Sequence, residues 1–361
     1  MENNEGLVLL VRRLTILLTR VGEFWLNRSY VQQITLILLV LLAKNAFDIE
    51  LRNIQDAYLP GAQEFPRAVG YFSASFGQVV IAYGLGVTTT TQWVVLHLFL
   101  IAIALGVAFY LVGTADPGNR SLMLLVVASA TATSSLLTSV GKYDVLTYLG
   151  AVILALAKTL PGSVVGSAIM ASGNPEQAMV ASAALLLLTF APEFRAARAR
   201  AVGALVLIAF SWLGVQAWFA SSALTVGRLN LIPRYLAESI ANFVVYPGTS
   251  LWSWLNAGWL LVLAAIVLVA KTSRKWLALA LVVVPGVAAL ITADGPRVFG
   301  LVGLPAFLVA TTWLIGRTSA RTPSSIWAGV LVVGIVVFPT YVPGTGWAYA
   351  LVLGNLVSLF P

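Results

Sequence analysis

The stretch SVGKYDVLTYLGAVILALAK (residues 139–158) opens an apolar run with Lys142, Tyr143 and Asp144 at its start. Such a run predicts a helix in a bilayer, because about twenty residues at a rise of roughly 1.5 Å each match the hydrocarbon thickness. A carboxylate at the mouth of that helix is either an N-cap or part of a polar cavity. We therefore ask whether the whole chain belongs in a membrane and where its other polar groups gather.

The composition is typical of an integral membrane protein. Of the 361 residues, 60% are hydrophobic and 9% are charged, and the mean hydropathy is +0.94. A soluble domain carries about 25% charged residues, which solvate its surface. The apolar runs are continuous rather than alternating, which favours helices over a β-barrel. We expect an all-α, polytopic transmembrane bundle of about 9–11 helices. The expected spans lie near 30–46, 90–113, 121–139, 145–158, 202–225, 255–270, 276–292, 300–316 and 326–341.

The residue types that are absent or rare exclude several chemistries. The chain has no cysteine, so disulfides, thiol nucleophiles and thiolate metal sites are excluded. Its one histidine, His97, stands inside an apolar run, where we interpret it as a buried or lipid-facing residue. The formal net charge of +8 fits basic loops that face anionic lipid headgroups, so we expect no nucleic-acid partner.

Residues 1–28 predict a cytoplasmic amphipathic segment. They begin acidic, and Arg12, Arg13 and Arg20 interrupt their apolar run, so the pattern is not that of a signal peptide. Leucine and valine recur on one helical face, as in helices that lie on a membrane surface. We expect residues 29–361 to form a single transmembrane helical domain.

The basic residues orient the predicted spans. With a cytoplasmic N-terminus, about twice as many Lys and Arg fall on the cytoplasmic side as on the other, as the positive-inside rule requires. This orientation needs segment 163–190 to enter and return on one side, because RAARAR (195–200) belongs in the cytoplasm. SGNPEQ (172–177) interrupts that segment, so we interpret it as a broken or re-entrant helix pair. A full crossing by 163–190 would invert every later loop.

A long first extracytoplasmic loop is expected over 47–89. Asp48, Arg52 and Asp56 recur there at every fourth residue and share one helical face, so Arg52 can pair with either carboxylate. Solvated ion pairs explain such a face, at about a few tenths of a kcal/mol each. Asp48, however, stands at the membrane boundary, where it can face a cavity.

Two polar stretches accompany the apolar run with which we began. GKYD places Lys142 and Asp144 at the helix mouth, where the aspartate serves either as an N-cap or as a cavity residue. Glu176 stands in the predicted break of segment 163–190. An ionisable group at membrane depth costs a few kcal/mol unless it faces a polar cavity, so we favour a functional role for Glu176.

A third stretch, TADGPRVFG (292–300), holds Asp294 and Arg297 between two predicted spans. Asp-Gly-Pro is ordinary turn chemistry. An arginine near a membrane face is also the usual grip for phosphate, by its charge and its planar fork. Arg228 and Arg234, on another predicted outside loop, are rivals for that role.

This layout resembles the GT-C superfamily of polytopic membrane glycosyltransferases, which use polyprenyl-phosphate-linked sugars. The resemblance rests on a first span that ends in an acidic residue, a long outside loop, GKYD opening a helix, and a helix pair interrupted at GNPEQ. Many members carry a G-(H/Q/N)-x-D stretch before a similar run. The resemblance covers roughly residues 30–200 and is one of layout more than of motif. Where members carry D-x-D or E-x-D, this chain has D-I-E (48–50).

The resemblance implies a mechanism and partners. Asp48 would be the general base on an acceptor hydroxyl, and an arginine would stabilise the lipid phosphate that leaves. The implied partners are a polyprenyl-phosphate-linked sugar and an extracytoplasmic glycan, lipid or protein acceptor, at the plasma membrane of a bacterium. Some members use a divalent cation at the acidic loop and others do not, so the cofactor is left open. The expected substrate-binding residues are Arg52, Asp56, Lys142, Asp144, Glu176, Arg228, Asp294 and Arg297.

Other functions fit the same pattern. Broken helices with Pro and Glu at mid-depth are common at transporter and flippase substrate sites. A polymerase or ligase of lipid-linked glycans uses similar substrates, and a structural partner in an assembly is a third class. Long polar loops on one side with short connections on the other favour one-sided chemistry over alternating access.

Overall fold

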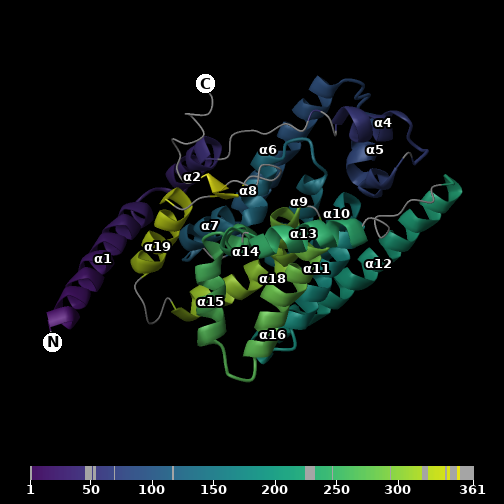
Figure 1. Cartoon of the computed structure of the whole chain (residues 1–361). Coiled ribbons are helices and arrows are strands. Elements are labelled where there is room, and N and C mark those ends of the chain that lie inside the picture. Colours follow the sequence, from purple (N-terminus) through teal and green to yellow (C-terminus); the bar gives the residue numbers. More distant parts are fainter. Residues whose placement is uncertain are drawn as a thin grey trace.

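The computed structural model describes residues 2–44, 51, 54–68, 70–115, 118–223, 232–245, 247–292, 294–318, 324–337, 340–341 and 348–349. Within these residues the chain is almost wholly helical, as the composition predicts (Figure 1). The longer helices are α1 (Glu2–Leu26), α2 (Tyr30–Lys44), α6 (Thr90–Ala115), α9 (Asp144–Leu156), α10 (Leu160–Gly173), α11 (Pro175–Leu188), α12 (Arg198–Ser221), α13 (Ile232–Val245), α15 (Gly258–Leu268), α18 (Gly295–Thr318) and α19 (Ser324–Val337).

Shorter elements connect them. These are the π-helices η1 (Ile54–Tyr58) and η5 (Leu279–Val283), the 3-10 helices η2 (Tyr71–Ala74) and η3 (Pro192–Ala197), and the helices α4 (Leu59–Gln63), α5 (Phe76–Gly84), α7 (Arg120–Ser129), α8 (Thr131–Thr138), α14 (Pro247–Leu255), α16 (Arg274–Ala278) and α17 (Val284–Leu290). Strands β1 (Thr340–Tyr341) and β2 (Ala348–Tyr349) form one antiparallel pair.

Fewer long spans are present than the sequence predicts. In the described part of the chain, three segments are long and apolar enough to cross a membrane: Thr90–Thr114, Pro192–Ser221 and Gly295–Thr318. The number rises to 5 if each of two bent helix pairs counts as one span. The other expected spans are helices of 10–17 residues or shorter pieces. The prediction that these apolar runs are helical is confirmed. The helices are, however, interrupted at more places than the sequence predicted.

The predicted span 121–139 illustrates such a break. Helices α7 and α8 meet at Ala130, whose backbone is extended, and they are bent by 56°. Polar side chains satisfy the backbone at the bend, since Ser129 Oγ donates to Val126 O and Thr133 Oγ1 donates to Val127 O. Local hydroxyl-to-carbonyl bonds of this kind compete with helix continuation.

The predicted broken pair over 163–190 is present as α10 and α11, which meet at Asn174. Asn174 is extended, and its Oδ1 accepts from the backbone N–H of Gln177, so it caps α11. Arg200, at the start of α12, donates to Ala157 O at 2.6 Å, just past the end of α9. The start of α10 and the end of α11 therefore lie at one end of the bundle, and Asn174 lies at the other.

Glycines bring α9 and α10 into backbone contact. A Cβ atom at Gly150 would lie 2.3 Å from the backbone nitrogen of Met170, and one at Gly166 would lie 2.6 Å from that of Leu154. Small residues allow this close approach, which is a common way for helices to associate in membranes. The two helices consequently form a tight hairpin.

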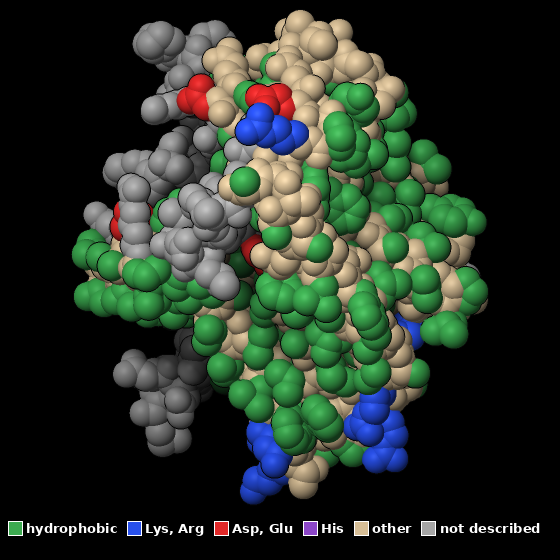
Figure 2. Space-filling view, turned by 90° about the vertical axis from the view of Figure 1, so that its right-hand side faces the viewer, with side chains coloured by type: hydrophobic (Ala, Val, Ile, Leu, Met, Phe, Trp, Pro, Cys, Tyr) green, Lys and Arg blue, Asp and Glu red, His purple; other side chains and the backbone are tan. Residues whose placement is uncertain are grey.

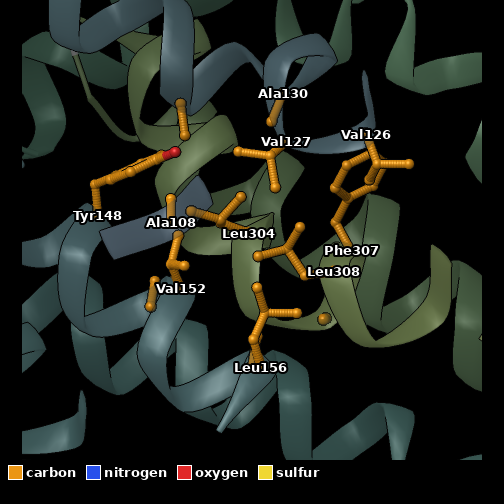
Figure 3. Close-up of a cluster of buried hydrophobic side chains, with 14 of the residues drawn as sticks. Ala108, Val126, Val127, Ala130, Tyr148, Val152, Leu156, Leu304, Phe307 and Leu308 are labelled. Atoms are coloured by element: carbon orange, nitrogen blue, oxygen red, sulfur yellow. The ribbon is translucent and has the colours of Figure 1, made fainter. Parts of the chain in front are cut away.

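One hydrophobic core joins most of the helices. Figure 3 shows a part of it, where Tyr148 and Val152 of α9 face Leu304 and Leu308 of α18. The only polar atom of the Tyr148 side chain is satisfied by Thr133 Oγ1 at 3.1 Å. This core fixes α9 against α18, and both helices begin at the site described below.

The segment expected as a long outside loop (47–89) is folded where the structure describes it. Elements η1, α4, η2 and α5 form a helical cap over one end of α6 (Figure 1). Ile54, Tyr58 and Val79 bury their side chains against Trp93 of α6 in a separate apolar cluster. Likewise, the segment of Arg228 and Arg234, which was expected to be another outside loop, contains α13 and is followed by α14. In the first segment, buried apolar residues such as Ile54 and Val79 supply the faces that favour helices over loops, and in α14, which follows the second, Trp254 and Leu255 are buried.

The surface has an apolar middle and a basic end. Figure 2 shows a broad band of hydrophobic side chains, with Lys and Arg side chains without acidic neighbours at its lower end and others beside acidic side chains near the top. That end carries the turn between α15 and α16, where Lys271 and Arg274 are exposed (Figure 1). Apolar residues such as Val206, Phe210 and Leu263 are exposed. An apolar girdle of this kind is expected of a protein in a bilayer. Which end of the bundle faces the cytoplasm stays a prediction from the distribution of Lys and Arg.

Helix α1 occupies the predicted amphipathic segment. Its C-terminal half packs against α19 so closely that a Cβ atom at Gly22 or Gly329 would overlap the backbone of the other helix. Val8 to Val11, near its N-terminus, are exposed. α1 is bent by 116° from α2, which follows it. A position for α1 along the membrane surface remains a prediction.

Candidate functional site

A cavity of about 450 Å³ lies between the cap and the bundle. Its volume is within the range of small-molecule sites, roughly 300–1,000 Å³. Its walls come from η1, η2, α9, α11, α12, α13, α17 and α18. The cavity lies at the end of the bundle that holds Asn174. The turn at Lys158 lies at the other end, about 20 Å away along α9. Figure 2 shows an acidic side chain set back among apolar ones in the middle of this face.

Ion pairs form the polar end of the cavity. Arg297 Nη1 donates to Asp144 Oδ2 at 2.5 Å, and Arg297 Nε lies 2.7 Å from Asp294 Oδ2. Lys142 Nζ donates to the same Asp294 oxygen at 3.0 Å. The Asp144 side chain is 6% exposed and that of Arg297 is 18% exposed. A pair as buried as this one holds its geometry, because either partner alone would be an uncompensated charge.

Three helix N-termini converge on these carboxylates. Asp144 is the first residue of α9, Glu176 stands in the first turn of α11, and Asp294 directly precedes α18 and accepts from Val298 N–H through its backbone carbonyl. The N-terminus of a helix carries about half a positive charge, so an acidic residue there is stabilised. This placement explains why three carboxylates gather in an otherwise apolar protein.

The charge state of Asp294 follows from its neighbours. Burial alone raises the pKa of its carboxyl, but the charges of Arg297 and Lys142 outweigh that effect and hold the pKa below its ordinary value. Asp294 is therefore ionised at neutral pH and keeps both cations in place.

The turn before α9 depends on a glycine. Gly141 has φ +98°, a conformation that other residues rarely adopt, and Trp93 Nε1 donates to its carbonyl at 3.0 Å. A Cβ atom at Gly141 would also lie 2.7 Å from Ile54 of the cap. The GKYD stretch is thus fixed from both sides, which orients Lys142 and Asp144.

Aromatic rings form the wall of the cavity beside Asp144. The ring of Tyr58 lies 4.5 Å from that of Tyr143 and 5.0 Å from that of Phe72, measured between centroids. All three residues line the cavity. They come from the cap and from the turn before α9, so the cap completes the site.

Another part of the lining is aliphatic. Val180 of α11 packs against Ala288, Val298 and Val302, and all four line the cavity with Met179. The cavity is therefore amphiphilic, because charged and amide side chains line part of it and apolar side chains line most of the rest. A ligand with a polar head and a hydrocarbon chain matches this arrangement.

The structure brings together five of the predicted substrate-binding residues. Asp144, Glu176, Asp294 and Arg297 line the cavity, and Lys142 holds Asp294 from outside the lining.

Asp56 is not in this group. It is exposed and does not line the cavity, whereas Ile54 and Tyr58 of the same π-helix are buried. Sequence spacing suggested a shared face for 48, 52 and 56, but the inward face of η1 is the apolar one. The predicted base Asp48 lies outside the described residues, as do Arg52 and Arg228. The side chain of Arg234 is not described.

Several lining residues were not predicted. Trp212 and Gln216 stand one helical turn apart on α12, and Gln177 follows Glu176 on α11. A glutamine inside an apolar span was an available signal, since such residues seldom face lipid. Tyr58 and Phe72 gave no signal, because aromatic residues in an outside loop are unremarkable.

Within the described residues, no three Asp, Glu or His side chains form a group that could hold a metal ion. The acidic stretch 48–50 is not among the described residues. Comparisons with known protein families, curated protein sequences and solved structures find no match to this chain. The described part of the chain is thus an almost wholly helical protein with segments long and apolar enough to span a membrane and with an amphiphilic cavity.

Proposed function

We propose that the chain is a membrane glycosyltransferase with a GT-C-like fold, which moves a sugar from a polyprenyl-phosphate carrier to a glycan, lipid or protein acceptor. The observation that carries the proposal is the amphiphilic cavity, whose lining combines buried charged groups with apolar side chains. A lipid-linked sugar has the same division into a hydroxyl-rich head and a hydrocarbon chain.

The position of the cavity supports chemistry on one side of the membrane. It lies at the end of the bundle opposite the basic turns at Lys158 and Arg195–Arg200, which the positive-inside rule assigns to the cytoplasm. We propose that the N-terminus is cytoplasmic, that the cavity is extracytoplasmic, and that the membrane is a bacterial plasma membrane.

The residues take the following roles in this proposal. Asp48 removes the proton from the acceptor hydroxyl as it attacks the anomeric carbon, and the lipid phosphate leaves. Asp144 and Glu176 accept hydrogen bonds from sugar hydroxyls. Carboxylates are suited to this because an ionised carboxylate is an acceptor only, and charge-assisted hydrogen bonds are the strong ones.

The test is transfer of labelled sugar from a panel of polyprenyl-phosphate donors to membrane acceptors by the purified full chain. Asp48→Asn should lower the rate at least on the order of 100-fold, as expected when a general base is removed. Asp56→Asn is the matched control: it makes the same change further along the same segment of the sequence, at an exposed side chain, and we expect it to retain activity.

The possible outcomes test the glycosyltransferase activity separately from the role of Asp48. If the wild-type protein and Asp48→Asn transfer sugar equally well, the protein is a glycosyltransferase but Asp48 is not its general base. Absence of transfer with every donor, by protein that still binds a lipid-linked sugar, would refute the glycosyltransferase.

A flippase or other transporter is the second candidate, and one observation favours it. The break at Asn174 points the N-terminus of α11 at the cavity, an arrangement that transporters use to hold anionic groups. A lipid-linked sugar that becomes accessible on the far side of vesicles only when the protein is present would support this alternative.

A further inference from the structure

Exposed cations gather at the end of the bundle opposite the cavity, around a contact between two turns. Glu193 of η3 joins η3 to the turn from α15 to α16, because its carboxylate accepts from Ser273 Oγ at 2.6 Å and from the backbone N–H of Ala270 at 3.3 Å. Figure 2 shows Lys and Arg side chains at this end, below the apolar band. We define the basic patch as the four exposed residues Arg195, Lys271, Lys275 and Arg317.

Aromatic rings hold the patch against the bundle. Arg317 lies over the ring of Trp313 at 5.8 Å, and Trp313 packs against Phe194 of η3 with 5.5 Å between ring centroids. Lys275 lies over the ring of Trp276 at 5.1 Å. The end of α18 therefore belongs to the same surface as η3. Cations on long stems beside tryptophan rings are typical of the headgroup level of a membrane.

The patch has more cations than acids. Glu193 is the only acidic residue in η3, α12, α15, α16 and α18. From residue 239 to residue 361 the sequence has one acidic residue, Asp294, which lies at the other end of α18. Among the described residues, Arg195 and Lys271 form no ion pair or hydrogen bond through their side chains. The excess positive charge is thus available to an anionic partner.

Capping of helix C-termini does not account for this excess. Two neighbouring arginines do serve as caps. Arg198 Nη2 donates to Thr189 O, just after α11, and Arg274 Nη2 donates to Val267 O in the last turn of α15. Within the described part of the chain, the four residues of the basic patch make no hydrogen bond to a backbone carbonyl.

An exposed apolar face leads away from the patch along α15. Leu260, Leu263 and Val267 recur three or four residues apart, so they share one face of the helix, and all three are exposed. This face ends at the turn that carries Lys271. A soluble polyanion would contact the cations alone, whereas a phospholipid would cover both the cations and the apolar face.

We propose that the basic patch binds an anionic phospholipid whose headgroup carries two phosphate diesters, with its acyl chains along Leu263 and Val267. Four exposed cations stand around one carboxylate, which is more positive charge than one phosphate diester balances. Basic surfaces between membrane helices bind headgroups of this kind. The lipid joins the same two turns as Glu193 and stabilises their contact. The site does not depend on the proposed transfer reaction.

The test measures lipid binding by the purified full chain in a non-ionic detergent. Native mass spectrometry counts the bound lipid, and thermal unfolding reports stabilisation. The ligands are diphosphatidylglycerol, phosphatidylglycerol at twice the molar amount to match the charge, and pyrophosphate, which has no acyl chains. Diphosphatidylglycerol should bind at least about tenfold more tightly than phosphatidylglycerol and raise the unfolding midpoint, and pyrophosphate should leave the midpoint unchanged.

A triple variant removes charge from both turns. Arg195→Gln/Lys271→Gln/Lys275→Gln should weaken binding of diphosphatidylglycerol at least about tenfold, because each cation near the phosphates contributes to the attraction. Arg195→Lys/Lys271→Arg/Lys275→Arg keeps the charges and should retain binding. Unfolding midpoints without lipid establish that each variant is folded, and the comparison of lipids on wild-type protein does not require the variants.

The matched control removes three exposed cations from another part of the chain. Arg12→Gln/Arg13→Gln/Arg20→Gln changes α1 by the same charge and should bind the lipid as wild-type protein does. The proposal is overturned if this control and the triple variant of the patch bind diphosphatidylglycerol alike, or if phosphatidylglycerol at matched charge binds as tightly. Equal stabilisation by pyrophosphate would also overturn it, since the patch would then be a site for soluble polyanions.

Discussion

Arg297 donates to Asp144 across 153 positions of sequence, joining the first residue of α9 to the first turn of α18. Both helices run from this contact into the shared apolar core. Arg297 also lies against Asp294, which Lys142 holds from the other side. Four charged groups thus form one chain of contacts at the polar end of the cavity.

Removal of Arg297 should destabilise the protein. Arg297→Met leaves Asp144 buried without its partner cation, and breaking a buried pair costs about 3–5 kcal/mol. The midpoint of thermal unfolding should fall accordingly. Arg317→Met, at an exposed position near the other end of the same helix, is the matched control and should change the midpoint little.

The double variant Arg297→Met/Asp144→Leu sharpens this prediction. Since the cost arises from an unpaired charge, replacing both partners should recover part of the lost stability. A double variant that is less stable than the sum of the two single changes would contradict the assignment of the pair.

Acidification should remove the contribution of Asp294. Its pKa is held below the ordinary value in the folded protein, so its stabilising effect is complete above about pH 4 and is lost as pH falls through the folded pKa. The difference in unfolding midpoint between wild-type protein and Asp294→Asn should be constant near neutral pH and shrink on acidification. A difference that widens below about pH 4 would show the opposite sign.

The hairpin of α9 and α10 should not tolerate a side chain at its contact. Gly166→Ala places a Cβ atom 2.6 Å from the Leu154 backbone and should cost about 1–3 kcal/mol through forced separation. Gly203→Ala makes the same change on α12, where a Cβ atom meets nothing within 4 Å. There alanine should be neutral or stabilising by up to about 1 kcal/mol, because it favours the helix. Unfolding midpoints of the two variants provide the comparison.

Cysteine labelling can establish which end of the bundle faces the cytoplasm, because the chain has no native cysteine. Thr159→Cys and Arg195→Cys introduce exposed thiols at either end of the α10–α11 pair, and Gln63→Cys introduces one on the cap. The first two should react with an impermeant maleimide only after the membrane is opened, and the third in intact cells. Opposite sidedness for positions 159 and 195 would mean that the pair crosses the membrane once.

The sequence predicted the helical class and much of the polar end of the cavity. Glu176 was singled out because an ionisable group is costly at membrane depth, and Asp144 because it stands at a helix mouth. Asp294 and Arg297 were singled out as charges in a turn between two predicted spans. The break at Ala130 was harder to predict. It is accompanied by hydroxyl-to-carbonyl bonds of Ser129 and Thr133 that an apolar sequence window does not reveal.

The aromatic wall of the cavity could not be predicted from the sequence, for a different reason. Tyr58 and Phe72 enter the site because the cap folds back over α6 and buries apolar residues such as Val79 against Trp93. Nothing local distinguishes these aromatic residues from others in the same segment. Only the tertiary arrangement selects them, whereas a charge in an apolar run is informative by itself.

The glycine contact between α9 and α10 has a consequence for how this protein can diversify. The separation of the two helices is set by backbone atoms at Gly150 and Gly166, away from the cavity lining. Side chains such as Gln177, Gln216 and Phe72 can therefore change without altering the frame that carries Asp144. The scaffold and its selectivity are separable, so a new ligand can be accommodated by exchanging a few lining residues on a fixed architecture.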